Sequence, residues 1–303
     1  SGVFEWYQRN TNGMLAPGVQ LPAVVGASAP YQNPADMRTR GWELSLNWRD
    51  QIGKVGYRIG FNLSDYKSEI IKYDDNAATK LLSSYYPGQT LGEIWGYVVD
   101  GYYTVDDFVD TSSWQLKEGV TSINGYNVRP GDVKFKNLRD DDTSTNVITS
   151  GDNTFDNPGD RKVIGNTTPR YQYGINLGMN YAGFDLNVIL QGTGKRDYWI
   201  SNVLTFPMNG DNFVPLFEGL SDYWMPKDPD NGDWSAVNPN AKYPRIYGNR
   251  GNSGSNLRQS DKYLSDASYL RIKNITLSYK LPKKWVNQIF LNQMKAFVSI
   301  ENV

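Results

Sequence analysis

Hydrophobic and polar residues alternate one by one between Tyr171 and Tyr181. One face of this segment carries the apolar set Tyr171, Tyr173, Ile175, Leu177, Met179 and Tyr181, while the other face carries only Gln, Gly and Asn. A period of two predicts a β-strand with one apolar face. After Ala182-Gly183 the phase flips, and the apolar positions become Phe184, Leu186, Val188 and Leu190. The flip predicts a hairpin, because the residues that flank a two-residue turn point to the same face.

A second hairpin is predicted between residues 41 and 64, with its turn at Ile52-Gly53. Its apolar positions are Trp42, Leu44, Leu46 and Trp48 before the turn, and Val55, Tyr57, Ile59, Phe61 and Leu63 after it. Further strands are predicted at residues 3 to 9, 269 to 281 and 295 to 302, with a phase slip before Ile275. The chain is therefore expected to be all-β.

Two architectures bury one apolar face of such strands. In a soluble sandwich a second sheet covers it, and most connections are short. In a transmembrane antiparallel β-barrel it meets lipid, and short turns at one end alternate with long loops at the other. Here the connections alternate, with long ones at residues 10 to 40, 72 to 169 and 196 to 268, two-residue turns at 52 to 53 and 182 to 183, and a dozen residues at 282 to 293. This favours a barrel with periplasmic turns and long extracellular loops, and a soluble carbohydrate-binding β domain is the alternative.

The spacing of aromatic residues also favours a membrane. At about 3.3 Å per residue, the strand from Tyr171 to Tyr181 is roughly 33 Å long, and a tilt of about 40° projects this to roughly 25 Å. That is the height of the apolar band between the two aromatic girdles of an outer-membrane barrel. We expect the lipid-facing girdle residues to be Trp42, Trp48, Tyr171 and Tyr181.

Composition narrows the function classes. The chain has no His and no Cys, which excludes a Ser-His-Asp triad, a cysteine nucleophile and ordinary zinc, haem or iron–sulfur sites. A net charge of −1 does not indicate the excess of basic residues that binding to phosphates needs, so no nucleic-acid partner is expected. No run of about 18 apolar residues occurs, and the first residues, SGVFEWYQRN, do not form a signal peptide.

Five sequence words, in order, resemble one known family. They are MRTRGWELSLNW, LGEIWGYVVDGYYT, PGDVKFKNLRDDD, GDRKVIGNTTPRYQYGINLGMNYAGFDLNVILQGTGKRD and YLSDASYLRIKNITLSYKLP. Together, with their intervening lengths, they look like the C-terminal part of the SusC/RagA-type TonB-dependent (TonB-linked) outer-membrane transporters of Bacteroidetes. The resemblance covers most of residues 1 to 303, and it implies a C-terminal fragment of a barrel of about 22 strands.

The resemblance also implies a function and partners. Such transporters import oligosaccharides or peptides across the bacterial outer membrane. They work with a SusD-like surface lipoprotein that closes the extracellular mouth, and the TonB-ExbB-ExbD complex energises them through an N-terminal plug. Two transporter–lipoprotein pairs can associate as a dimer. The plug and the final strand or strands are not in this sequence, so the chain is expected to be a piece of a larger transporter whose sheet edges would otherwise stay open in lipid.

An acidic loop makes calcium a candidate ligand, although no cofactor is required. Between Asp100 and Asp160 there are twelve acidic and five basic residues. Asp152, Asp156 and Asp160 are spaced in part like an EF-hand loop, but Thr154 is a weak third ligand and Asn157 stands where that loop has glycine. A solvated acidic loop without a metal is the alternative.

Aromatic residues in the long loops are candidate substrate-binding residues, because their rings can stack on sugars while neighbouring polar groups bind hydroxyls. They are Trp114, Tyr198, Trp199, Trp224 and Trp234. The alternative is that they pack within the loops or against the lipoprotein. The adjacent acids Asp106 and Asp107 leave a glycoside hydrolase as the least favoured reading. We expect no catalytic residues and no enzyme activity.

Overall fold

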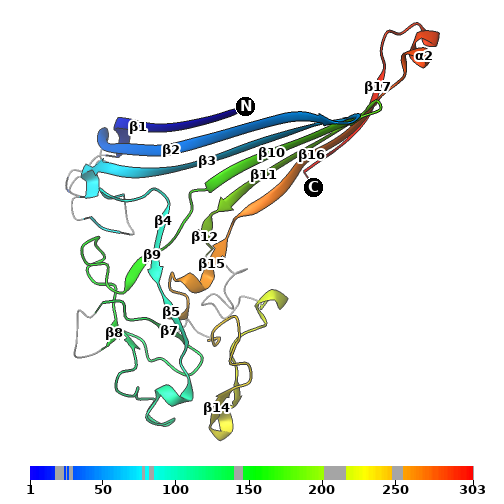
Figure 1. Cartoon of the computed structure of the whole chain (residues 1–303). Helices are drawn as coiled ribbons and strands as arrows, with labels where there is room; N and C mark the ends of the chain where they lie inside the picture. The colour runs from blue at the N-terminus through cyan, green and yellow to red at the C-terminus, as the bar shows by residue number, and fades with distance from the viewer. Residues whose placement is uncertain are drawn as a thin grey trace.

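A computed structural model of the chain describes residues 1–17, 24, 26, 30–76, 79–81, 85–139, 146–200, 216–247 and 255–302. Its main feature is one seven-stranded sheet (Figure 1) in the order β1-β2-β3-β10-β11-β16-β17. All neighbours in this sheet are antiparallel. The strands are β1 (Gly2–Pro17), β2 (Tyr31–Ile52), β3 (Val55–Tyr73), β10 (Arg170–Tyr181), β11 (Phe184–Lys195), β16 (Tyr269–Lys280) and β17 (Lys295–Glu301). The seven strands expected from the alternation are therefore confirmed.

One face of the sheet is continuously apolar. Residues directly opposite one another in adjacent strands share a face, and one such row is Trp48, Ile59, Leu177, Val188, Ile275 and Ile300. The next row towards the turns is Tyr57, Met179, Leu186, Leu277 and Val298. Many of these side chains are exposed, with Trp48 at 60% and Leu177 at 39%. No second sheet lies on this face among the residues that the structure describes, so a soluble sandwich does not fit it.

The opposite face is polar. Arg58 reaches Asp185 with Nη1 3.4 Å from Oδ2, and its Nη2 donates to Oδ1 of Asn187 at 3.3 Å. Gly178 leaves the room for this side chain, because a Cβ there would collide with Arg58. Ile189 stands between Asn176 and Asn274 as the apolar exception.

The two tight turns lie where the phase flips, but the first is displaced from its predicted position. Tyr181 pairs with Phe184 across Ala182-Gly183, as expected, and both turn residues have positive φ. In the other hairpin Ile52 pairs with Val55, so the turn is Gly53-Lys54 and not Ile52-Gly53. Gly53 has a φ of +60°, and a glycine at the first central position is what a type II′ turn requires. Because the turn moves by one residue, each residue of β2 pairs two residues further along β3 than predicted. A shift of two residues keeps the same side chains on the apolar face.

The predicted long connection over residues 10 to 40 is wrong. β1 runs to Pro17 and β2 begins at Tyr31, so only residues 18 to 30 connect them. These strand ends extend beyond the apolar band, where polar side chains pair across the strands. Arg40 Nε donates to Oε1 of Gln8 at 2.9 Å, and Arg38 Nε donates to Oδ1 of Asn10 at 3.3 Å. Pairing there does not depend on an apolar face, and alternation could not reveal it.

The phase slip predicted before Ile275 is a β-bulge. Ile189 pairs with Asn274, but the next residue, Leu190, pairs with Ile272, which leaves Lys273 unpaired. One extra residue in a strand reverses the faces that follow it.

The predicted girdle residues occupy the apolar side of the strands. Trp42 stacks on Phe4 with ring centroids 6.4 Å apart, and Trp48 donates to the Tyr57 hydroxyl at 3.4 Å. Tyr171 and Tyr181 mark the two ends of β10 and are about half exposed. Their contact with lipid stays a prediction. In the described part of the chain, no helix is long and apolar enough to span a membrane.

The two longest connections fold into a compact region at the other end of the sheet from the tight turns (Figure 1). Its short strands are β4 (Glu93–Tyr97), β5 (Val99–Tyr102), β6 (Ser122–Ile123), β7 (Val133–Phe135), β8 (Val147–Ile148), β9 (Arg161–Asn166), β12 (Asp197–Trp199), β13 (Pro226–Asp228), β14 (Asp233–Ala236) and β15 (Leu264–Asp266). They pair as β4-β9, β5-β7, β6-β8, β12-β15 and β13-β14.

The buried core of the protein lies in this loop region and not on the sheet. Its main cluster is Tyr97, Tyr103, Phe108, Ile123, Val128, Val133, Phe135 and Ile148. The helices are short: α2 (Lys283–Val286), η2 (Asp74–Asn76), η3 (Val105–Asp107), η4 (Glu218–Leu220), η5 (Pro229–Asn231), η6 (Asp261–Tyr263) and η7 (Asn287–Ile289). A segment with its own core holds side chains in fixed positions, which a binding site requires.

Candidate ligand-binding site

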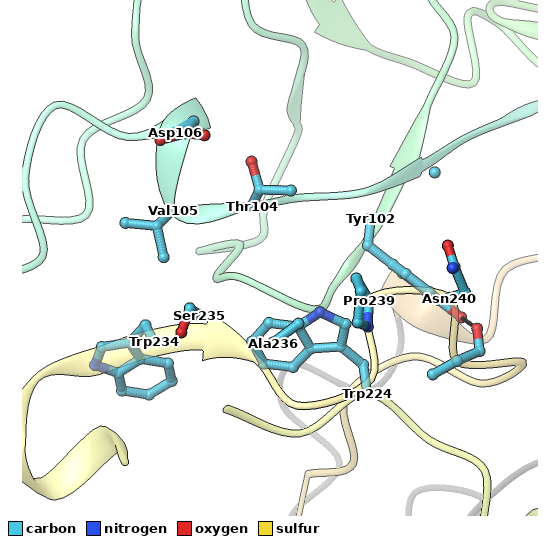
Figure 2. Close-up of a pocket in the computed structure, with 12 residues that line it drawn as sticks. Tyr102, Thr104, Val105, Asp106, Trp224, Trp234, Ser235, Ala236, Pro239 and Asn240 are labelled. Carbon is cyan, nitrogen blue, oxygen red and sulfur yellow. Dashed lines mark hydrogen bonds between the residues drawn. The ribbon is translucent and has the colours of Figure 1, made fainter. Parts of the chain in front are cut away.

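A pocket of about 630 Å³ lies between the two long connections (Figure 2). The connection from β3 to β10 supplies Gly101, Tyr102, Thr104, Val105 and Asp106, and the connection from β11 to β16 supplies Trp224, Trp234, Ser235, Ala236, Pro239, Asn240 and Ala241. Figure 2 shows Thr104, Val105 and Asp106 on one side and the two tryptophans on the other. We call this cavity the loop pocket. Its mixture of aromatic rings with a few polar groups is typical of small-molecule sites.

Hydrogen bonds tie the two connections together around the loop pocket. The Tyr102 hydroxyl donates to the Ala241 carbonyl at 3.0 Å, and the Arg245 amide donates to the Gly131 carbonyl at 2.8 Å. Burial raises the pKa of Tyr102, and the charge of Asp222 raises it further. The phenol therefore stays protonated and acts as a permanent donor at neutral pH.

A buried carboxylate lies behind the pocket. Asp132 is 2% exposed. It accepts hydrogen bonds from the Tyr247 hydroxyl at 2.7 Å, the side-chain amide of Asn256 at 2.9 Å and the backbone N–H of Arg129 at 2.8 Å. Burial raises the pKa of Asp132, while these hydrogen bonds oppose the shift. Because Tyr247 and Asn256 follow Asp132 by more than a hundred residues, this network fixes one connection against the other.

The ring of Trp234 is held in place on two sides. Trp114 meets it edge-on at 5.0 Å, and the Arg245 guanidinium lies over it at 4.9 Å. Trp224 is only 3% exposed and packs where a Cβ on Gly131 would stand. Gly131, with a φ of +90°, is thus required both for the backbone and for the tryptophan. Trp234 is half-buried and has ring surface left for a ligand.

The structure brings together three of the five predicted aromatic residues. Trp224 and Trp234 line the loop pocket, and Trp114 contacts Trp234 without lining it. Tyr198 and Trp199 lie elsewhere, in β12, which pairs with β15. Trp199 packs against a second buried cluster of Leu220, Tyr243 and Tyr263, whereas Tyr198 is 47% exposed.

Sequence reasoning missed the other lining residues. Tyr102 and Thr104 end the word LGEIWGYVVDGYYT, which gave no sign of a pocket, and Val105, Ser235, Pro239 and Asn240 belong to no motif. Only the fold places these residues around one cavity. Of the adjacent acids, Asp106 lines the pocket, but Asp107 accepts from the Thr104 amide at 2.7 Å and pairs with Lys134 at 3.1 Å. Asp107 is thus held by contacts within its own connection, and only Asp106 of the two faces the cavity.

The three aspartates considered for calcium have different surroundings. Asp160 is fully buried and accepts hydrogen bonds from the backbone amides of Leu138 at 2.9 Å and Thr149 at 2.7 Å. Asp152 and Asp156 are exposed, and Asp152 accepts from the Asn157 side chain at 3.1 Å. Within the described ranges, no three acidic side chains form a group that could hold a metal ion. The acidic run Asp140 to Asp142 lies outside those ranges, so calcium binding stays a prediction.

Comparison with known proteins gives relatives of one kind, although no family model matches the chain. The chain is 26% identical over 315 residues to TonB-dependent receptor P3 of Formosa agariphila, covering 99% of this chain and 27% of that protein. It is 25% identical to TonB-dependent receptor P39 of the same organism, covering 98% of this chain and 29% of the relative. The chain thus spans less than a third of the length of these curated relatives.

Solved structures give the same fold. The RagAB peptide transporter matches with a TM-score of 0.67 at 18% identity, over 99% of this chain and 29% of that chain. The RagAB peptide importer in its open-open state matches with a TM-score of 0.66 at 18% identity, over 100% of this chain and 28% of that chain. The open seven-stranded sheet and its loop region therefore have the fold of part of a transporter barrel.

Proposed function

We propose that the protein imports oligosaccharides or peptides across the outer membrane. This proposal starts from the likeness of the chain to the SusC/RagA-type TonB-dependent receptors of that membrane. The observation that supports this most strongly is the single sheet with one apolar face, tight turns at one end and a folded loop region at the other. Such strands satisfy their backbone in lipid when the sheet is closed by further strands.

In this function the loop pocket is a contact point for the imported molecule at the extracellular end. Trp234 offers a fixed aromatic surface, and Asp106, Ser235 and Asn240 offer acceptors and donors beside it. A ring fixed before binding loses little freedom when the ligand arrives, which favours affinity. Both a sugar ring and a peptide side chain can stack on such a surface.

Transport then needs two partners. A SusD-like lipoprotein closes the extracellular mouth over the captured molecule, with the loop region as its docking surface. The TonB-ExbB-ExbD complex supplies energy through a plug. Two pairs, each of one transporter and one lipoprotein, associate as a dimer. The length of the two folded connections supports the docking role, since long folded loops on a rigid scaffold are usually functional.

Binding and uptake by the full-length receptor test this function together. A receptor that lacks its TonB-contacting segment should still bind oligosaccharide or peptide at the cell surface but fail to accumulate it. Loss of growth on the cognate nutrient with retained surface binding is the expected result. Unchanged uptake in this variant, or in a strain without the receptor, would contradict the proposed import.

A further inference from the structure

The connection from β16 to β17 has an unusual surface. Residues 281–294, which we call the basic aromatic loop, contain α2 and η7. Figure 1 shows α2 projecting beyond the end of the sheet where the β10-β11 turn lies. The Lys280 amide donates to the Gly183 carbonyl of that turn at 2.8 Å. The loop therefore begins level with the tight turns, at the end opposite the loop pocket.

Large apolar side chains of this loop are exposed. Phe290 is 98% exposed and Trp285 58% exposed, and the further exposed ones are Ile289, Leu291 and Met294. The loop is nevertheless ordered around Val286, which is 1% exposed and accepts the Leu291 amide at 3.2 Å. Phe290 has a φ of +61°, a conformation that is costly for an aromatic residue. A folded loop that holds apolar residues outwards indicates a partner surface.

The charge of the loop and its flanks has one sign. Lys280, Lys283, Lys284 and Lys295 carry four positive charges, and the sequence has no acidic residue between Asp266 and Glu301. In the part of the chain that the structure describes, no carboxylate forms a salt bridge with any of these lysines. The partner surface should therefore be both apolar and anionic.

The loop also continues the apolar face of the sheet. The Leu281 amide donates to the Met294 carbonyl at 3.0 Å, which extends the β16-β17 ladder into the loop. Leu281 follows Leu277 and Tyr279 on the same face, and the Tyr279 ring contacts the Phe184 ring beside the tight turn in a tilted arrangement, with centroids 4.5 Å apart. The exposed loop residues thus adjoin the apolar face that we assign to lipid, at the end of the sheet where the tight turns lie.

We propose that the basic aromatic loop lies in the headgroup region of the periplasmic leaflet and binds anionic phospholipids there. Trp285 and Phe290 insert at the boundary between headgroups and acyl chains, and Lys283 and Lys284 of the loop pair with lipid phosphates. Aromatic and lysine side chains are the residues that settle at this boundary. The inference rests on the proposed membrane function, and it adds a lipid-dependent anchor at the end of the sheet that faces the periplasm.

Spin labels on the full-length receptor in lipid nanodiscs test this. The chain has no cysteine, so Phe290→Cys adds one attachment point once any cysteines elsewhere in the receptor are replaced. Accessibility to oxygen, which concentrates in lipid, is compared with accessibility to a water-soluble nickel chelate. In discs of phosphatidylethanolamine with phosphatidylglycerol, the Phe290 label should favour oxygen. With Lys283→Gln and Lys284→Gln together, or in phosphatidylcholine alone, the preference should shift towards the nickel chelate.

Two control labels separate the possible failures. Leu177→Cys reports the lipid-facing strand, and Gly53→Cys reports the tight turn between β2 and β3. If Leu177 favours oxygen while Phe290 responds to nickel as Gly53 does, the loop is in water and the proposed anchor is wrong, although the barrel stands. If Phe290 is shielded from both reagents, protein covers the loop and the anchor is also wrong. Nickel access at Leu177 would instead overturn the proposed membrane function itself.

Discussion

A charge placed on either face of β10 should distinguish the lipid side from the wet side. Leu177 belongs to the apolar row that crosses the sheet, and it is flanked by Ile59 and Val188. It lies six residues from Tyr171 and four from Tyr181. These separations correspond to heights of about 15 Å and about 10 Å at a strand tilt of about 40°. Leu177 is therefore near the middle of the expected apolar band.

Leu177→Arg should cost about 2–4 kcal/mol, the usual cost of arginine on the lipid face near the bilayer midplane. This lowers the ratio of folded to unfolded receptor by roughly 30-fold to 1,000-fold. Asn176→Arg is the matched control, because Asn176 faces the other way and lies opposite Gly60, which leaves space. We expect the Asn176 variant to lose less than about 1 kcal/mol.

The assay is denaturant unfolding of full-length receptor folded into liposomes, followed by tryptophan fluorescence and by the mobility shift of folded barrel on a gel. The expected order is wild type, then Asn176→Arg close behind, and Leu177→Arg far below. Equal losses for the two variants would mean that both faces of β10 are dry, and the assignment of the apolar face to lipid would fail.

The remaining predictions concern topology and the loop pocket. An impermeant maleimide on intact cells should label Glu118→Cys but not Gly183→Cys. Equal labelling of the two variants would contradict the assigned topology. Trp234→Ala should weaken ligand binding by about 2 kcal/mol, roughly 30-fold, in a titration of the purified receptor, whereas the exposed Tyr198→Ala outside the pocket should bind normally; equal affinities for both would remove Trp234 from the site. Gly131→Ala should lower hydrogen-exchange protection of the loop region more than Gly119→Ala, because both glycines have positive φ but only the Gly131 Cβ would meet Trp224. Equal losses there would mean that backbone strain alone sets the cost.

The sheet could be predicted from the sequence because the residues on the two faces of each strand differ in polarity. Leu177 and Asn176 differ in polarity because they face different surroundings, and the period of two follows directly. The turn at Gly53-Lys54 was missed by one residue, although glycine at the first turn position was the available signal. The ends of β1 and β2 were missed because Arg38 and Arg40 pair with polar side chains outside the apolar band.

The loop pocket could be predicted only in part. Trp224 and Trp234 were identifiable as large aromatic residues in long polar loops, but their meeting with Tyr102 depends on contacts between two connections far apart in the chain. The network that joins Asp132 to Tyr247 has the same origin. Tyr198 was indistinguishable in sequence from the pocket residues, and only the pairing of β12 with β15 places it elsewhere.

The most direct test of the central claim is a photocrosslinking scan along β10 in living cells. A benzophenone amino acid is placed at each residue from 172 to 180 of the full-length receptor, and lipid adducts are identified by mass spectrometry. We expect lipid adducts at Tyr173, Ile175, Leu177 and Met179, and none at the residues between them. Adducts without this alternation, or assembled receptor without adducts at any of the four positions, would contradict it.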